Sequence, residues 1–129
     1  MRLSLIYEGF NLDVKKITLE RATSLTQPQD IRDIGDWLGK DPTQIDWFLG
    51  SEPIENFASQ ISEMESTYDE FPKDKARTEK IFALLKSGAK PMPIFVKFGD
   101  ETKFIMEGRH RMVAFSWMGM KSIPVIYPH

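Results

Sequence analysis

The sequence predicts an α+β fold, in which a small mixed sheet packs with helices. Short apolar runs typical of strands occur near both ends of the chain, and several stretches between them repeat apolar residues at helical spacing. The chain has 129 residues, of which 41% are hydrophobic and 28% are charged, a size and composition that suit one core. We therefore expect a single domain over residues 1–129.

The N-terminal half is expected to contain two strands followed by an acidic helical insertion over about residues 30–66. Asp30 is a candidate N-cap, because a carboxylate there can accept from the first backbone amides of a helix. Pro53 suits the first turn of a later helix, where its missing amide donor costs nothing. The expected strands are residues 3–7 and 14–19, and the expected helices are residues 30–38, 43–49 and 51–64.

The C-terminal half alternates helices and strands. Gly88 is suited to end a helix, since glycine adopts left-handed backbone freely. Pro124 lacks an amide donor, which places the last strand at a sheet edge or places the proline at the start of that strand. The expected elements are a loop around Pro72, a helix over 73–87, a strand over 93–98, a hairpin connection over 99–102, a strand over 103–106, a helix over 109–117 and a strand over 123–127.

Composition excludes several classes of protein. The chain has no cysteine, which excludes disulfides, a thiolate nucleophile and zinc sites built on cysteine, and fits a reducing compartment. No apolar run approaches the ~20 residues that span a bilayer. The N-terminus lacks the long apolar stretch and the cleavage site of a signal peptide. We therefore expect a cytoplasmic protein with no membrane partner.

Charge is distributed unevenly, although the net charge is only −2. Residues 1–72 contain 14 acidic and 6 basic side chains, whereas residues 73–129 contain 5 and 11. The basic half favours an anionic ligand. Alternatively, the two halves attract each other within one domain, and the sequence leaves both interpretations open.

The candidate site is the turn Glu107-Gly108-Arg109-His110-Arg111, which follows an apolar run and precedes a helical pattern. The first amides of a helix are unpaired and carry about half a positive charge together, so a strand–glycine–helix turn suits an anion. Arginine offers a fork of donors to phosphate oxygens, and histidine can also donate. We interpret the turn as a phosphate- or nucleotide-binding site; the alternative is a solvent-facing turn whose arginines pair with the acidic half.

Residues 87–127 resemble the ParB/sulfiredoxin superfamily. Members of that family have a proline-led strand, a hairpin, a Gly-x-x-Arg turn that opens a helix, and a closing strand, in the order expected here. The residues that carry the resemblance are Gly108, Arg111, Ala114, Gly119 and the closing Ile123-Pro124-Val125-Ile126.

The resemblance implies a ParB-like mixed sheet whose turn contacts nucleotide phosphates, with ATP, ADP or CTP as the ligand. Gly108 would allow close approach of the phosphates, and Arg109, His110 and Arg111 would surround them. Glu107 stands where the serine-kinase branch of the family has an acidic residue, so Glu107 and His110 are the candidate catalytic residues. A nucleotide would bring Mg²⁺ with it, and the candidate ligand carboxylates are Glu107, Glu79 and Asp100.

Two known uses of the family turn are not expected. Sulfinic acid repair needs a cysteine where Arg109 stands, and DNA partition in its usual form needs further domains after this one. The expected function is a nucleotide-binding NTPase or phosphotransferase. One alternative is a DNA-binding module or nuclease of the same family. Another is a non-catalytic interaction protein, such as a phage or mobile-element accessory protein, whose acidic helical half binds a protein partner.

Four aromatic residues of the acidic half, Trp37, Trp47, Phe48 and Phe57, could serve that partner. Large aromatic side chains most often pack in the core, and we expect core packing for this set. An exposed partner surface is the alternative.

Overall fold

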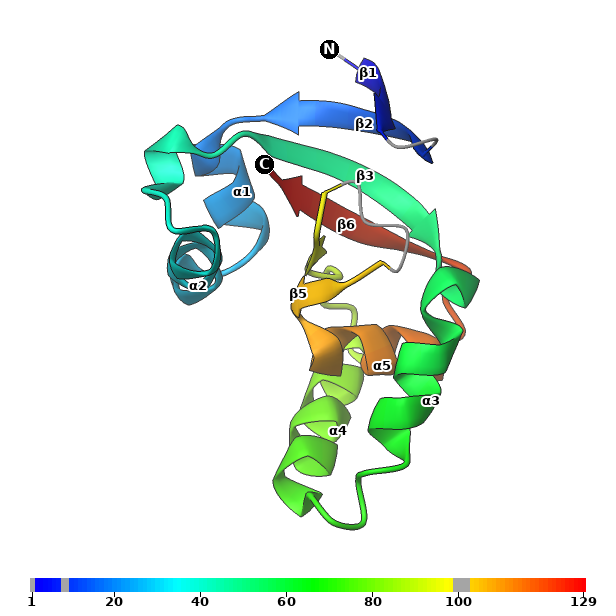
Figure 1. Ribbon diagram of the computed structural model, residues 1–129. Coiled ribbons are helices and arrows are strands. Elements are labelled where there is room, and N and C mark those ends of the chain that lie inside the picture. The colour runs from blue at the N-terminus through cyan, green and yellow to red at the C-terminus, as the bar shows by residue number, and fades with distance from the viewer. Residues whose placement is uncertain (1, 8–9, 99–102) are drawn as a thin grey trace.

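A computed structural model of the chain describes residues 2–7, 10–98 and 103–129. It confirms the predicted α+β class, since strands and helices are mixed along the chain (Figure 1). The strands are β1 (Arg2–Tyr7), β2 (Phe10–Ile17), β3 (Trp47–Pro53), β4 (Ile94–Val96), β5 (Ile105–Glu107) and β6 (Ser122–Pro128). The helices are α1 (Leu19–Leu25), α2 (Pro28–Leu38), α3 (Ala58–Glu65), α4 (Pro72–Lys86) and α5 (Arg109–Trp117), with short 3₁₀ helices at Pro42–Gln44 and Ile54–Phe57.

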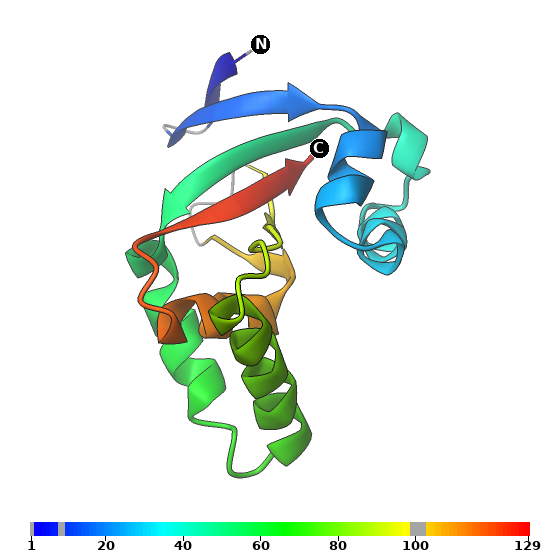
Figure 2. The same ribbon diagram turned by 180° about the vertical axis from the view of Figure 1, so that it is seen from behind.

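The strands form one mixed sheet in the order β1-β2-β3-β6-β4-β5. β6 pairs antiparallel with β3 along its whole length, and parallel with β4 at Val125 and Ile126. The other neighbouring strands are antiparallel. Figures 1 and 2 show the helices in two separate groups, α1 with α2 and α3 with α4 and α5. The two helix groups cover opposite faces of the central strands, since alternate residues of β4 and β6 pack with different groups.

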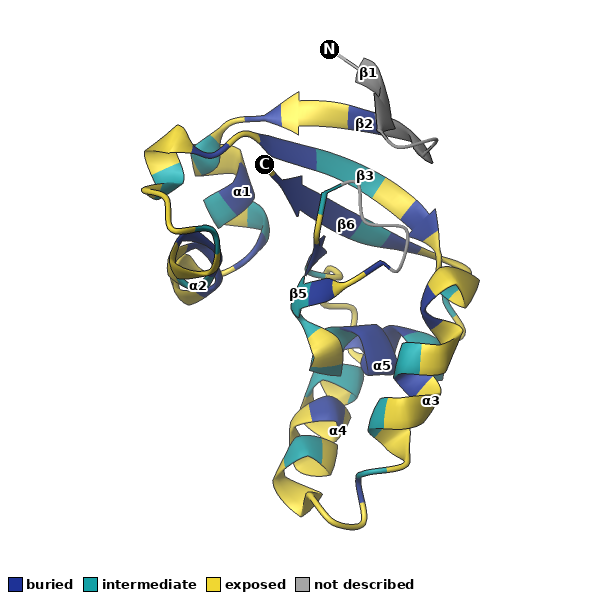
Figure 3. Cartoon of the chain, in the orientation of Figure 1, coloured by how far each residue is buried: buried dark blue, intermediate teal, exposed yellow. Residues whose placement is uncertain are grey.

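Side chains of the central strands alternate between two cores. Ile94 and Val96 on β4 pack with α3, α4 and α5, whereas Phe95 between them packs with α1 and α2. On β6, Tyr127 and Ile126 divide in the same way. A strand that is covered on both faces has no polar position, which explains why β4 and β6 are apolar runs without alternation. Figure 3 shows this burial along β6 and α5, while the outer sides of α3 and α4 are exposed.

The helix predicted over residues 43–49 is wrong. Only Pro42–Gln44 is helical, and the chain then forms β3, which lies between β2 and β6. Trp47 and Phe48 point to opposite cores, as successive residues of a strand do. A short apolar run fits both helical and extended periods, so its sequence could not distinguish them. The predicted helical insertion over 30–66 therefore contains a strand of the main sheet.

Other boundaries also differ from the prediction. The second strand ends at Ile17 rather than at residue 19, and an unpredicted helix, α1, follows, with the Thr18 side chain capping it. Asp30 is the third residue of α2 and not its N-cap, which is Gln27. Its carboxylate accepts from the Gln27 amide at 3.3 Å, as in a capping box. The helix predicted over 51–64 is wrong in its first part, because β3 continues to Pro53 and a 3₁₀ helix precedes α3. The helix predicted over 73–87 is confirmed as α4, but Pro72, expected in a loop, is its first residue. The helix predicted over 109–117 coincides with α5.

The last strand, β6, is not at the edge of the sheet but lies between β3 and β4. Pro124 is tolerated because the pairing with β4 begins only at Val125, one residue further along. The predicted hairpin connection over 99–102 lies outside the described residues. Within the described ranges, no helix has both the length and the apolar character to cross a membrane.

Candidate functional site

The predicted turn connects β5 to α5, and Gly108 is the residue between them. Its φ of 100° lies in the left-handed region, which favours glycine. A Cβ at this position would lie 3.0 Å from Cγ2 and 3.3 Å from Cα of Ile94 on β4. Both the backbone conformation and the packing of the turn against β4 therefore require glycine here, whatever the turn binds. No side chain caps the N-terminus of α5.

Arg111 points from α5 toward α2 and makes two hydrogen bonds. Its Nη2 donates to Oδ2 of Asp30 at 2.5 Å, and its Nη1 donates to the carbonyl of Pro93 at 3.0 Å. The side chains of Arg111 and Asp30 are only 12% and 7% exposed. Arg111 thus holds α2, α5 and the segment before β4 together, and part of its donor capacity is used inside the protein.

The two most buried ion pairs of the described residues join the acidic half to the basic half. One is Arg111–Asp30, and the other places Nζ of Lys103 3.2 Å from Oε1 of Glu52. The hydroxyl of Tyr127 donates to the other oxygen of Glu52, and burial together with this carboxylate raises the pKa of the hydroxyl. Attraction between the two halves therefore accounts for part of the charge asymmetry in the sequence.

His110 is held by a carboxylate that the sequence did not indicate. Its Nε2 lies 3.0 Å from Oδ1 of Asp74, which is in the first turn of α4. Because a carboxylate only accepts, Nε2 of His110 carries the proton in this hydrogen bond. The pair fixes the orientation of the ring, as a carboxylate does for a catalytic or ligating histidine.

Glu107 precedes the glycine and is partly buried. Burial raises the pKa of its carboxyl, and the neighbouring carboxylates of Asp30 and Asp33 raise it further, while Arg111 and Arg109 oppose the shift. Glu107 therefore keeps its proton to a higher pH than an exposed glutamate does. Raised carboxyl pKa values are typical of general acids, although structural burial also produces them.

A cavity of about 510 Å³ opens beside the turn, and we call it the turn cavity. It lies between the start of α5, the start of α2 and one side of α4. The turn contributes Glu107, Gly108, His110 and Arg111 to its lining, and α2 contributes Asp30 and Asp33. Helix α4 and the segment after it contribute Arg77, Lys80 and Lys90.

The wall of the turn cavity that α4 and the segment after it contribute is cationic. Arg77 and Lys80 are exposed on α4, and Lys90 is exposed in the segment that follows it. None of these three side chains lies within ion-pair distance of a carboxylate in the described part of the chain. The same cavity is bordered by Gly108 at the N-terminus of α5, which no side chain of the described residues caps, so a helix start adds to the positive charge of these side chains.

Arg109 does not line the turn cavity. It is exposed and lines a second hollow of about 560 Å³ with residues of α2, α3 and the segment before β5. Of the four residues predicted to bind phosphate, Gly108, His110 and Arg111 lie at one cavity and Arg109 lies at another. The arrangement expected from the resemblance, in which three consecutive side chains surround one phosphate, is therefore not the one seen here.

The predicted metal ligands do not come together. Glu79 is exposed on α4 and does not line the turn cavity, and Asp100 lies outside the described residues. Among the residues that the structure describes, no group of three or more His, Asp or Glu side chains could hold a metal ion. Glu107 remains beside Asp30 and Asp33, one of which is already paired with Arg111.

Sequence reasoning missed the partners of the turn. Arg77 and Lys80 lie three residues apart, about one helical turn, and this spacing indicates a basic face on α4. No comparable signal marks Asp30 and Asp74, which reach the turn from 81 and 36 residues away along the chain.

Comparison with known proteins gives no relative. No protein-family model matches the chain, and no curated protein or solved structure is significantly similar to it.

Proposed function

We propose that the protein binds the phosphate groups of a nucleotide in the turn cavity. The observation that carries this proposal is the convergence of three exposed cations, Arg77, Lys80 and Lys90, on a cavity that also contains the uncapped start of α5. Helix N-termini and basic side chains together are a common means of holding phosphate. The volume of about 510 Å³ is within the range of small-molecule sites.

The charges of the cavity suit a ligand with a few negative charges. The pair Arg111–Asp30 is internally neutral, which leaves three cations against Asp33 and Glu107. The raised pKa of Glu107 weakens the repulsion that this carboxyl would exert on a phosphate. A nucleotide fits this balance better than a long polyanion, whose binding depends on a wider basic surface.

A phosphotransferase or NTPase is the enzymatic form of this proposal. His110 would act at the bound phosphates, with its ring oriented by Asp74, and Glu107 would hold or release a proton beside them. The resemblance of residues 87–127 to the ParB/sulfiredoxin superfamily supports a nucleotide as the ligand. ATP, ADP and CTP, each with and without Mg²⁺, are the ligands to be compared.

The cationic wall allows a test that leaves the fold intact. Arg77 and Lys80 are exposed, so the double variant Arg77→Gln/Lys80→Gln should fold normally while it loses two phosphate donors. We expect its affinity for the best nucleotide to fall about tenfold or more, which corresponds to ~1.4 kcal/mol or more. Isothermal titration calorimetry with the nucleotide panel measures this directly.

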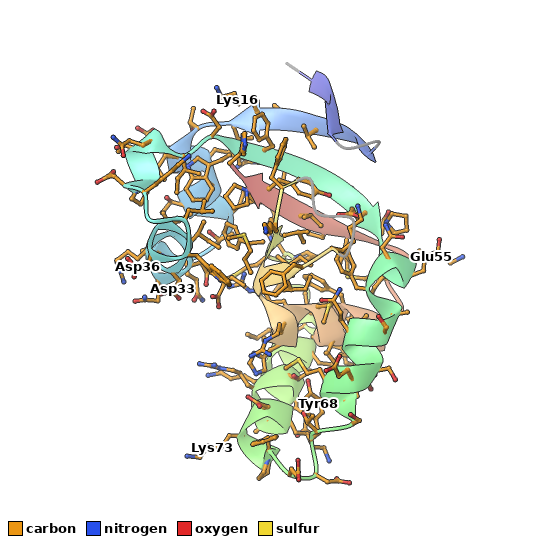
Figure 4. All side chains as sticks on the ribbon, in the orientation of Figure 1. Lys16, Asp33, Asp36, Glu55, Tyr68 and Lys73 are labelled. Carbon is orange, nitrogen blue, oxygen red and sulfur yellow. The ribbon has the colours of Figure 1, made fainter. Side chains whose placement is uncertain are left out.

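Lys73→Gln is the matched control. Lys73 is exposed on the same helix but does not line the turn cavity, and Figure 4 shows its side chain extending outward from the far end of α4. The control should bind as the wild type does. Failure of every nucleotide to bind the wild type, or an equal loss in Lys73→Gln, would refute the proposal. Arg111→Ala is unsuitable for this test because it removes the partner of a buried carboxylate.

A further inference from the structure

The second hollow beside the turn is lined mainly by apolar side chains, and we call it the aromatic groove. It runs between α2, α3, the start of α4 and the segment that leads into β5. Its volume is about 560 Å³. Its large apolar lining consists of Trp37, Met64, Phe71, Phe104, Met106 and Met112.

Three of these side chains are unusually exposed for their type. Trp37 is 57% exposed, Phe71 52% and Phe104 43%, and all three lie in the same groove. Single exposed apolar residues are ordinary, but several that gather in one hollow indicate a contact surface. Of the four aromatic residues singled out in the acidic half, Trp47, Phe48 and Phe57 are buried, so that Trp37 alone reaches this surface.

Contacts between the elements that line the aromatic groove hold its shape. The rings of Trp37 and Phe104 meet edge to face with their centroids 5.7 Å apart, which fixes α2 against the segment before β5. Buried Met112 forms part of the floor, so the groove is continuous with the core. Met64 and Met106 are half-buried, and methionine side chains adapt readily to the shape of a bound segment.

One wall of the aromatic groove is acidic: Glu63 and Asp74 line it, Asp74 also pairs with His110, and Arg109 is the one basic side chain among the described residues of the lining. Glu63, Met64, Thr67, Phe71 and Asp74 line it, and all of them come from residues 63–74. This segment contains five carboxylates and one lysine. A negatively charged wall beside an apolar groove repels nucleic acid and attracts a cationic segment.

We propose that the aromatic groove binds a basic amphipathic segment of a partner protein. Large apolar side chains of that segment would pack against Phe71 and the Trp37–Phe104 ring pair, and its Lys or Arg residues would lie along the acidic wall. Methionine-rich and aromatic grooves bind amphipathic helices in this manner. The proposal does not rest on nucleotide binding, since no residue that the structure describes lines both the turn cavity and the aromatic groove. The two sites meet at Asp74, which lines the groove and holds His110 of the turn cavity.

The probe for this proposal is a random dodecapeptide library displayed on phage and selected against the intact protein. Enriched peptides, synthesised with a fluorescent label, should carry large apolar residues and a net positive charge. Their affinity, measured by fluorescence anisotropy, should fall about tenfold or more in Trp37→Ala and in Phe71→Ala, because exposed aromatic anchors dominate such interfaces. Added salt should also weaken binding.

Leu84→Ala is the matched control, since Leu84 is an exposed large apolar residue of α4 outside the groove. It should leave peptide affinity unchanged, as should Lys80→Gln in the turn cavity. Circular dichroism should show that both groove variants keep the wild-type fold. The proposal is overturned if no enriched peptide depends on Trp37 or Phe71, if the peptides are acidic, or if the wild type forms a dimer that Trp37→Ala dissociates.

Discussion

The Glu107–Arg111 turn borders a charged cavity on one side and a mainly apolar groove on the other. The two arginines of the turn show this difference most clearly. Arg111 is largely buried, donates to Asp30 and to the carbonyl of Pro93, and borders the charged turn cavity. Arg109, two residues earlier, is exposed and borders the aromatic groove. The first turn of a helix thus presents successive side chains in different directions, and a shared motif does not give them a shared role.

The cations around the turn cavity also differ in what they contribute: Arg111 stabilises the fold, whereas other cations remain available to a ligand. Arg111 faces a carboxylate that is itself buried, so its charge is needed to compensate that burial. The cations that remain available to a ligand are in α4 and in the segment after it, outside the motif. The residues of the turn therefore border the cavity, while the cations that border it without a buried partner among the described residues lie elsewhere in the sequence.

The largest expected effect is on stability, from removal of the buried arginine. Arg111→Ala should lower the free energy of unfolding by about 3–5 kcal/mol, because Asp30 would remain buried without its counter-charge. Arg109→Ala should change it by less than about 0.5 kcal/mol, as is usual for an exposed side chain. Urea denaturation followed by circular dichroism measures both values.

A double variant tests whether the pair itself is responsible. Asp30→Asn removes the buried charge but keeps an oxygen for the capping box of α2. Asp30→Asn/Arg111→Gln should then cost less than the sum of the two single changes. If the losses in the free energy of unfolding of the two single variants add, Arg111 and Asp30 do not stabilise the protein as a pair. If Arg111→Ala and Arg109→Ala lower it equally, the burial of Arg111 gives it no special role in stability.

The next largest effect concerns Gly108, which precedes both arginines at the start of α5. Gly108→Ala should lower the free energy of unfolding more than Gly88→Ala does. Both glycines have φ near 100°, but a Cβ at Gly108 would meet Ile94 at 3.0 Å, whereas a Cβ at Gly88 would meet nothing within 4 Å. The backbone strain is common to both variants, so their difference reports the packing of the turn against β4, about 1–3 kcal/mol.

Thermal and urea unfolding of the two alanine variants supply the comparison. If Gly108→Ala and Gly88→Ala lower the free energy of unfolding equally, the close packing of the turn against β4 does not contribute to stability. In that case the glycine at the start of α5 would be required for its backbone conformation alone.

Much of the fold could be predicted where local signals are strong. Gly88 and Gly119 mark the ends of α4 and α5, and the bounds of α5 agree with the prediction. The strand β3 could not be predicted, because its Trp47 and Phe48 are both apolar and face different cores. Which strands are central also depends on pairing between distant segments. The sequence therefore left open whether the last strand lies at an edge or carries Pro124 near its start, and the structure places it between β3 and β4 with Pro124 as its third residue.

The sequence predicts where the turn of the candidate site lies, but it predicts only some of the residues that surround this turn. The strand, the glycine and the helix of the turn are local, so the sequence located them. Asp30 and Asp74 reach the turn only through the packing of α2 and α4 against α5, and no periodic pattern connects them with Arg111 and His110. The sequence likewise could not show that Arg109 and Arg111 diverge, since that depends on which neighbours each side chain meets.

The smallest expected effect is the pH dependence contributed by Glu107, which lies on the cavity side of the turn. Its pKa is raised in the folded protein, mainly by burial and then by Asp30 and Asp33. Between the ordinary pKa of glutamate and this raised value, the folded state binds more protons than the unfolded state, so stability falls as the pH rises through that window. Glu107→Gln removes this contribution. The variant should therefore exceed the wild type in stability above the window, and the advantage should disappear as the pH falls below it.

Thermal unfolding between about pH 4 and pH 8 measures the trend. Glu79→Gln, on the exposed side of α4, gives the baseline for the same chemical change. A constant difference between Glu107→Gln and the wild type across this range would mean that the carboxyl titrates alike in both states, and that the charges on the cavity side do not act on it.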